Sequence, residues 1–281
     1  MAERTSAAPR PGTAPLTERS SRVAVARKLT RRAGREKAGA FLAEGAQAVG
    51  EALAAHVDGA VRVREVFTTG HERHAAALER ARAASVPVHL VTERAAASLS
   101  ETVTPQGLVA VCDLPDVGVA EALAARPKLV AVLVGVADPG NAGTVVRVAD
   151  AAGAGAVLFA GDTVDAYNGK AVRASTGSVF HLPVARNRDA AAVLAACRAA
   201  GLRLIGADGY ATDDLDTADL RGDLAEPTAW VFGSEAHGLP VAVRAELDTT
   251  LRVPLYGRAE SLNLATAAAV CLYASARAQH R

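Results

Sequence analysis

The sequence predicts an α/β protein with two units, a smaller leading one and a larger one built on a mainly parallel sheet. Short apolar segments alternate with helical patterns along most of the 281 residues. Several of these segments are apolar throughout, as expected of strands that are buried on both faces of a parallel sheet. Half of the residues are apolar and 22% are charged, so the chain can bury a sizeable core.

The leading unit is expected to span residues 21–113. Its alternating segment VRVREVFTT has the period of a half-buried strand, and the segments around it alternate between helix and strand patterns. The expected elements are a basic helix within 22–37, a short strand near Phe41, helices at 45–55 and 71–85, and strands at 61–69, 86–92 and 107–113.

The larger unit is expected at 128–281, and it begins with the continuous apolar run LVAVLVGV. Residues 114–127, with two prolines and a short Ala-rich stretch, are expected to form the linker. Residues 1–20, rich in Pro, Ala, Ser and Thr, are expected to form a disordered tail. The expected elements of the larger unit are strands at 129–136, 156–160, 179–184, 202–207, 228–232 and 250–254, and helices at 144–156, 188–200 and 262–279.

Charge is distributed unevenly. Residues 1–37 carry ten Lys or Arg and three Glu, a net +7, which leaves −6 on the rest of a chain whose net charge is +1. A basic segment on a mildly acidic body is typical of nucleic-acid binding, although a solvated tail has the same composition. The candidate phosphate contacts are Lys28, Arg31, Arg32 and Arg35.

The three cysteines are far apart and lack the spacing of a metal site, so we expect neither disulfides nor a bound metal. No apolar run reaches the roughly 18 residues of a membrane helix, and the first residues lack the apolar segment of a signal peptide. These features predict a cytoplasmic protein that does not enter a membrane.

Three polar loops follow predicted strands of the larger unit, where ligands bind in open α/β sheets. The first, DPGNAGTVVR, contains Asn141, which could simply cap a helix, and Arg147, which lies among valines. An arginine on a half-buried helix needs an anion. That anion is either a ligand or Asp150, three residues further along the helix.

The second and third loops are VFGSEAHGLP and VPLYGRAESLNLA. Glu235 is expected near a helix N-terminus, where a carboxylate is favoured. His237 is a weaker candidate for a general base. Ser261 and Asn263 both suit a helix N-cap, yet a cap needs only one such residue. The chain has no GxxxxGK[ST], GxSxG or HExxH motif, which argues against ordinary nucleotide hydrolysis and zinc hydrolysis.

With these three loops in order, the chain resembles the SpoU (TrmH-like) branch of the SPOUT methyltransferases. The segments that carry the resemblance are DPGNAGTVVRVADAAGA, VFGSEAHGLP and VPLYGRAESLNLATAAAV, with AYNGKAVRASTGSVFHLPV between the first two. The basic start RKLTRRAGREKAGAFLAEG is similar to the L30e-like RNA-binding domain that many members carry. The resemblance implies S-adenosylmethionine as cofactor, a deep trefoil knot near the C-terminus, and a homodimer formed through the knotted domain.

The resemblance also assigns residues. Asn141, Arg147, Glu235, Ser261 and Asn263 match the functional polar positions of the three motifs. The positions whose backbone faces the cofactor are matched by Gly233, Val253, Leu255 and Leu262, with Ala207 as a neighbour.

The expected reaction is methylation of a ribose 2′-hydroxyl, in 23S rRNA rather than tRNA. A guanidinium stays protonated at ordinary pH, so Arg147 either activates the hydroxyl, as the family implies, or stabilises a developing alkoxide or an RNA phosphate. A tRNA methyltransferase, a base-methylating enzyme, a non-catalytic RNA-binding protein and a role in antibiotic resistance are the alternatives.

Overall fold

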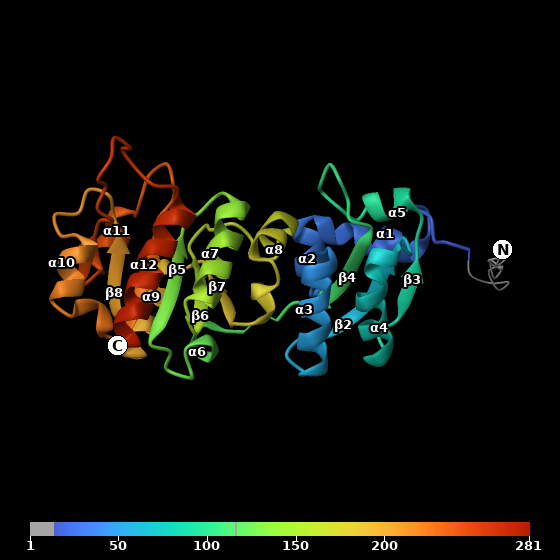
Figure 1. The fold of residues 1–281 in the computed structure, drawn as a ribbon, viewed down its shortest axis with the longest axis horizontal. Helices are drawn as coiled ribbons and strands as arrows, with labels where there is room; N and C mark the ends of the chain where they lie inside the picture. The colour runs from blue at the N-terminus through green and yellow to red at the C-terminus, as the bar shows by residue number, and fades with distance from the viewer. Residues whose placement is uncertain (1–13, 116) are drawn as a thin grey trace, which may run out of the picture.

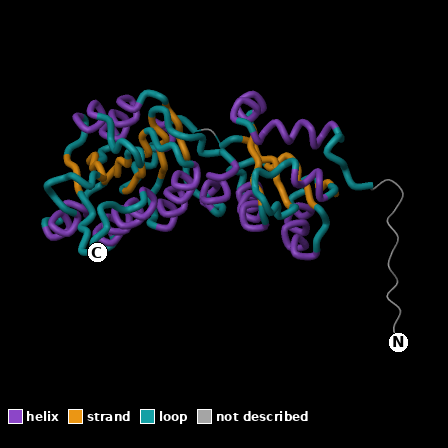
Figure 2. Tube along the Cα trace, turned by 90° about the horizontal axis from the view of Figure 1, so that it is seen from above, coloured by secondary structure: helices purple, strands orange, loops and turns teal. Residues whose placement is uncertain are grey.

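The computed structural model describes residues 14–115 and 117–281, which form two α/β units side by side (Figure 1). The leading unit has a four-stranded sheet in the order β1-β4-β2-β3, and the larger unit has a six-stranded sheet in the order β10-β8-β9-β5-β6-β7. Seen from above, helices flank the strands of both units (Figure 2). No helix among the described residues has both the length and the apolar character that crossing a bilayer requires.

In the leading unit, β4 lies between β1 and β2 and is antiparallel to both, while β3 pairs in parallel with β2. Helices α3 and α4 cover one face of this sheet, and α1, η1 and α5 cover the other. The elements are α1 (Ser21–Arg27), η1 (Lys28–Thr30), α2 (Arg32–Ala38), β1 (Ala40–Glu44), α3 (Ala46–Val57), β2 (Val63–Thr68), η2 (Glu72–His74), α4 (Ala75–Ala83), β3 (Val88–Leu90), α5 (Glu93–Ala97) and β4 (Leu108–Asp113).

In the larger unit, every neighbouring pair of strands is parallel. The elements are α6 (Val119–Ala122), β5 (Leu129–Val134), α7 (Pro139–Ala151), β6 (Ala156–Ala160), α8 (Gly169–Ser175), η3 (Ser178–Phe180), β7 (Val184–Asn187), α9 (Ala190–Ala199), β8 (Arg203–Ala207), α10 (Leu215–Leu220), η4 (Asp223–Ala225), β9 (Thr228–Phe232), α11 (Val241–Ala245), β10 (Thr249–Leu251) and α12 (Leu264–Gln279).

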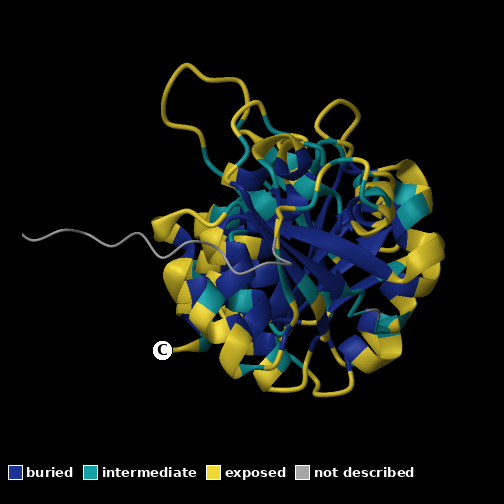
Figure 3. Cartoon of the chain, turned by 90° about the vertical axis from the view of Figure 1, so that its right-hand side faces the viewer, coloured by how far each residue is buried: buried dark blue, intermediate teal, exposed yellow. Residues whose placement is uncertain are grey.

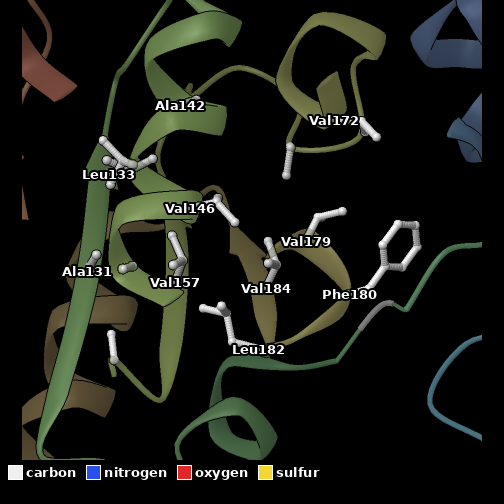
Figure 4. Close-up of a cluster of buried hydrophobic side chains, with 14 of the residues drawn as sticks. Ala131, Leu133, Ala142, Val146, Val157, Val172, Val179, Phe180, Leu182 and Val184 are labelled. Carbon is white, nitrogen blue, oxygen red and sulfur yellow. The ribbon is translucent and has the colours of Figure 1, made fainter. Parts of the chain in front are cut away.

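The continuous apolar run of β5 is explained by burial on both faces. Alternate residues pack beneath α7 and α12 on one side and beneath α9 on the other, and all six are buried. Figure 4 shows Ala131 and Leu133 of β5 in the cluster beneath α7, together with Val146 and Val157. An end-on view has the buried strands at the centre and the exposed helix faces outside (Figure 3). The mainly parallel sheet is as the sequence predicts; the trefoil knot stays a prediction.

Two expectations about local structure are wrong. The strand expected at 179–184 is instead the short helix η3 followed by β7, because Gly177 turns the chain with a positive φ and Pro183 precedes the strand. Residues 14–20 are not part of a disordered tail: Leu16 hydrogen-bonds across to β3 and packs against the leading core. The rest of the expected tail, 1–13, lies outside the described residues.

Arg35 is a further correction. We expected it to contact RNA phosphate, but it is only 3% exposed. Its Nε and Nη2 donate to Oδ2 of Asp165 in the larger unit, at 2.9 and 2.8 Å, and its Nη1 donates to two carbonyls of η1. A buried carboxylate needs a cationic partner. Arg35 therefore joins the two units and is not available to a nucleic acid.

Other contacts hold the same junction. The ring of Phe41 in β1 lies 4.9 Å from that of Tyr167 and 5.8 Å from that of Phe180 in the larger unit. His181 lies between Asp150 of α7, at 2.7 Å, and Glu51 of α3, at 3.3 Å. Burial lowers the pKa of His181, but its hydrogen bonds to these two carboxylates outweigh burial and leave the pKa raised. The two units therefore dock through a mixed apolar and ionic surface.

The substitution Arg35→Ala tests this docking. Removing one partner of a buried ion pair leaves an uncompensated charge, so we expect the free energy of unfolding to fall by about 3 kcal/mol, at the lower end of such effects because Arg186 still contacts Asp165. Urea unfolding followed by circular dichroism measures it. The control is Arg22→Ala, whose exposed pair with Glu65 contributes less than about 1 kcal/mol. Equal losses in the two variants would contradict a structural role for Arg35.

Candidate active site

The sheet order indicates where a ligand binds. From β5 the chain runs outward through β6 and β7 in one direction, and β8, β9 and β10 lie on the other side. The order thus reverses between β5 and β9, and a crevice forms at the carboxyl ends of strands at such a point. The first polar loop follows β5 and the second follows β9, so the sheet brings them together.

A cavity of about 830 Å³ lies at this edge of the sheet. It is lined by the end of β8, the loop after β9, the loop after β10 and the start of α12. All five residues that the resemblance assigns to the cofactor line it: Ala207, Gly233, Val253, Leu255 and Leu262. Glu235, Ser261 and Asn263 also line it, whereas Asn141 and Arg147 do not.

Three of the predicted polar residues form one hydrogen-bonded chain. Asn141 Nδ2 donates to Glu235 Oε1 at 2.6 Å, and Asn263 Nδ2 donates to Asn141 Oδ1 at 3.1 Å. Asn263 Oδ1 meanwhile accepts from the backbone N–H groups of Ala265 and Thr266, so it also caps α12. The first, second and third loops are therefore tied together by side chains that come from all three.

The position of Asn141 is set by the start of α7. Asp138 caps this helix through a bond from the backbone N–H of Asn141 at 2.8 Å, and Pro139 stands in the first turn, where proline is favoured. Lys170 of α8 donates to Asp138 at 2.6 Å. The Lys170 ammonium, with the N–H of Asn141, holds the pKa of Asp138 below its ordinary value.

The loop after β9 is closed by its own backbone. Ser234 and Gly238 exchange two backbone hydrogen bonds of 3.1 and 2.9 Å. A Cβ on Gly233 would lie 2.3 Å from the carbonyl of Gly238, so only glycine fits there. His237 is exposed at the rim of the cavity, and its backbone N–H donates to Ser234 Oγ.

Arg147 stands apart from this network. It lies six residues after Asn141 on α7, so the two side chains leave the helix in different directions. Its Nη1 donates to Thr176 Oγ1 at 3.3 Å, and within the described chain it bonds neither Asn141 nor Glu235. Asp150, the alternative ion-pair partner, is instead paired with His181. Arg147 is thus exposed, and no carboxylate within residues 14–115 and 117–281 is paired with it.

The candidate RNA-binding residues differ in their exposure. Lys28 and Arg31 are exposed, and Arg32 is half-buried beside Glu36 at 2.8 Å. Arg32 also lines a cleft of about 490 Å³ between the two units, together with Arg186 and Arg188 from the end of β7. Arg186 and Arg188 were not among the predicted residues, because the strand was expected at 179–184 and lies at Val184–Asn187. The feature of the sequence that could have indicated them is the basic segment ARNRD at 185–189, directly after the apolar stretch that ends at Val184.

Among the described residues, no cluster of three or more His, Cys, Asp or Glu side chains is arranged to hold a metal ion.

Comparison with known proteins decides the family. A model described as the SpoU rRNA Methylase family matches residues 128–273, and one described as the MRM3-like substrate binding domain matches residues 20–110. This chain belongs to the SpoU rRNA methylase family. The two matches fall on the two units of the fold.

Related proteins agree with this membership. A Bacillus subtilis protein named 23S rRNA (guanosine(2553)-2′-O)-methyltransferase RlmP is 35% identical over 88% of this chain and 92% of its own length. The structure of the SpoU methyltransferase AviRb from Streptomyces viridochromogenes, in complex with the cofactor AdoMet, matches with a TM-score of 0.80 at 31% identity, covering 92% of this chain and 98% of that one. An AdoMet-bound rRNA methyltransferase from Sinorhizobium meliloti matches with a TM-score of 0.80 at 28% identity, covering 94% and 98%.

Two substitutions of Asn263 separate its two roles in this SpoU-family chain. Asn263→Ala removes the N-cap of α12. We therefore expect the free energy of unfolding to fall by about 1 kcal/mol and the melting temperature to fall by about 2–4 °C. Asn263→Asp keeps an oxygen that accepts the two backbone N–H groups but cannot donate to Asn141, and its melting temperature should stay close to that of the unchanged protein. Thermal unfolding measures both. An equal loss in the aspartate variant would show that the bond to Asn141, and not the cap, stabilises the fold.

Proposed function

We propose that this chain transfers a methyl group from S-adenosylmethionine to a ribose 2′-hydroxyl of 23S rRNA, as a homodimer in the cytoplasm. Family membership makes it an S-adenosylmethionine-dependent RNA methyltransferase. The name of the Bacillus subtilis relative supports 23S rRNA as the substrate, and the AviRb complex supports the cofactor. The observation that carries the proposal is the hydrogen-bonded series Glu235–Asn141–Asn263, which joins all three motifs beside the cavity.

The cavity fits S-adenosylmethionine in size and in chemistry. Its volume of about 830 Å³ lies within the range of cofactor sites, about 300–1,000 Å³. Leu239, Leu251 and Val253 offer apolar surface for a purine. No backbone group from 253 to 262 hydrogen-bonds to the backbone of another described residue, so their N–H and C=O groups are available to the cofactor. When bound, S-adenosylmethionine supplies an electrophilic methyl group.

The polar side chains of the three motifs would then orient the ribose. Asn141 and Asn263 are held by their mutual bond, and Glu235 fixes the orientation of the Asn141 amide. Because a guanidinium stays protonated, Arg147 would hold the RNA phosphate or stabilise negative charge as it develops on the 2′-oxygen. Ser261 lines the cavity with no side-chain hydrogen bond to another described residue, so its hydroxyl is free to contact cofactor or ribose. Because these groups are held in place before the substrate binds, aligning the ribose hydroxyl with the methyl group costs less entropy.

The proposal of a homodimer is supported by apolar side chains that α12 exposes. Val270 and Tyr273 on α12 are 39% and 45% exposed, and the Tyr273 hydroxyl donates to the Ala151 carbonyl at the end of α7. α12 packs against α7, so the Tyr273 ring lies next to the end of that helix. A second copy that covers Val270 and Tyr273 would bury this apolar surface.

RNA would contact both units. Lys28, Arg31 and Arg32 on the leading unit, with Arg188 across the cleft, offer cations to RNA phosphates, whereas Arg186 is paired with Asp165. Phosphate contacts of this kind position the nucleic acid and do not read its sequence.

The variant Arg147→Ala tests the proposed reaction. Losing a group that stabilises charge in the transition state costs about 10²–10³ in rate, so methyl incorporation into 23S rRNA should fall by at least 10²-fold. S-adenosylmethionine affinity, measured by calorimetry, should stay unchanged because Arg147 does not line the cavity. Arg82→Ala, an exposed arginine of α4, is the control. Methylation at the unchanged rate in a folded, cofactor-binding Arg147→Ala protein would refute the assignment.

The variant Arg188→Ala tests the RNA path. Each phosphate contact adds roughly 0.7–0.9 to the slope of log affinity against log salt concentration. We expect Arg188→Ala to reduce that slope by about this amount while the turnover number with saturating rRNA is retained. Binding titrations of an rRNA fragment at several salt concentrations measure the slope. Arg82→Ala should leave it unchanged, and an unchanged slope in Arg188→Ala would exclude the cleft from the RNA path.

A further inference from the structure

The residue that ends α8 has an unusual conformation. Thr176 has φ 53° and ψ 35°, in the left-handed region. A β-branched side chain rarely adopts this region, and helices that end this way usually have Gly or Asn at the position. Backbone strain of this kind persists where the surrounding structure imposes it, and it often accompanies a functional role. The identity of Thr176 therefore needs a reason beyond ending the helix.

The side chain of Thr176 supplies that reason. A hydroxyl has one hydrogen to donate and two lone pairs that accept. Thr176 Oγ1 lies 3.5 Å from the carbonyl oxygen of Arg173 and 3.4 Å from that of Ala174, and its one hydrogen is directed at these two acceptors. Its lone pairs are left to accept from Arg147 Nη1 at 3.3 Å. Among the described residues it is the side chain that bonds the Arg147 guanidinium. The left-handed turn thus presents an acceptor to the exposed arginine.

The turn that carries Thr176 is fixed on its α7 side. A Cβ on Gly143 of α7 would lie 2.1 Å from the carbonyl of Ala171, so the two helices approach as closely as a glycine permits. Lys170 at the start of α8 is bonded to Asp138 at the start of α7. Figure 4 shows Val172 of α8 in the same buried cluster as Val146 of α7. Thr176 is therefore held at a fixed distance from the helix that carries Arg147.

The leading unit fixes the turn from the other side. A Cβ on Gly177 would lie 2.4 Å from Cγ of Glu51 in α3. The same Glu51 contacts His181, which in turn contacts Asp150, three residues after Arg147. Figure 1 shows α8 between α7 and the leading unit. The docked leading unit thus braces the turn against the helix of Arg147.

We infer that Thr176 is a positioning residue for Arg147, and that the turn 176–181 transmits the docking of the leading unit to the methyl-transfer site. This inference rests on the proposed function of Arg147. An exposed arginine has many side-chain conformations, and an acceptor on a braced turn favours one of them. The leading unit then has a role in catalysis besides binding RNA.

Three variants of the full-length protein test the inference. Thr176→Gly relieves the strained backbone and removes the hydroxyl, Thr176→Val keeps the shape and the strain without the hydroxyl, and Thr176→Ser keeps the hydroxyl. We expect kcat for rRNA methylation to fall about 10-fold in the Gly and Val variants, the size expected of one hydrogen bond to a charged group. The Ser variant should stay within about two-fold of the unchanged protein, and KM for rRNA should be retained in all three.

Stability separates positioning from a structural role. The Gly variant should melt about 2–4 °C higher, because relief of left-handed strain stabilises the fold. Lower activity with higher stability supports the inference. Unchanged kcat in both the Gly and Val variants, with an inactive Arg147→Ala, would overturn the inference and leave the proposed function standing. An active Arg147→Ala would overturn both.

Discussion

The arrangement of the whole molecule depends on one buried carboxylate. Asp165 accepts hydrogen bonds from Arg35 of the leading unit and from Arg186 of the larger one. A buried ion pair adds little net stability over apolar packing, but it is costly to break, so it selects one docking geometry among many. That geometry places α8 against both units. The residue that ends α8, Thr176, is the one that bonds Arg147.

The sequence was informative where structure is decided by neighbours along the chain. The run LVAVLVGV predicted a strand buried on both faces, and the structure has β5 there. The three polar loops were found because parallel strands bring their carboxyl ends to one edge of the sheet. The five cofactor residues were assigned by the resemblance to the SpoU branch and not by the residue pattern, and all five line the cavity. The sequence indicated Glu235, Asn141 and Asn263 as site residues, but it did not indicate the hydrogen bonds that join them.

The sequence was uninformative where two interacting residues lie far apart along the chain. Arg35 and Asp165 are 130 residues apart, and a basic helix has the same sequence pattern whether its arginine meets a phosphate or a buried carboxylate. Asp150 had the right spacing for Arg147, but His181 takes it. The expected strand at 179–184 began too early because an apolar run fits a short helix as well as a strand. These outcomes were settled by tertiary contacts that no local pattern encodes.

Asn263 shows why the site and the fold cannot be separated in this chain. Its oxygen accepts the first N–H groups of α12, and its nitrogen donates to Asn141. Aspartate has the acceptor without the donor, and serine has too short a reach to place both groups. Asparagine performs both tasks at this length. Since the contact that starts the last helix also orients the polar chain, the site is ordered whenever the helix forms, and little ordering is left for the substrate to impose.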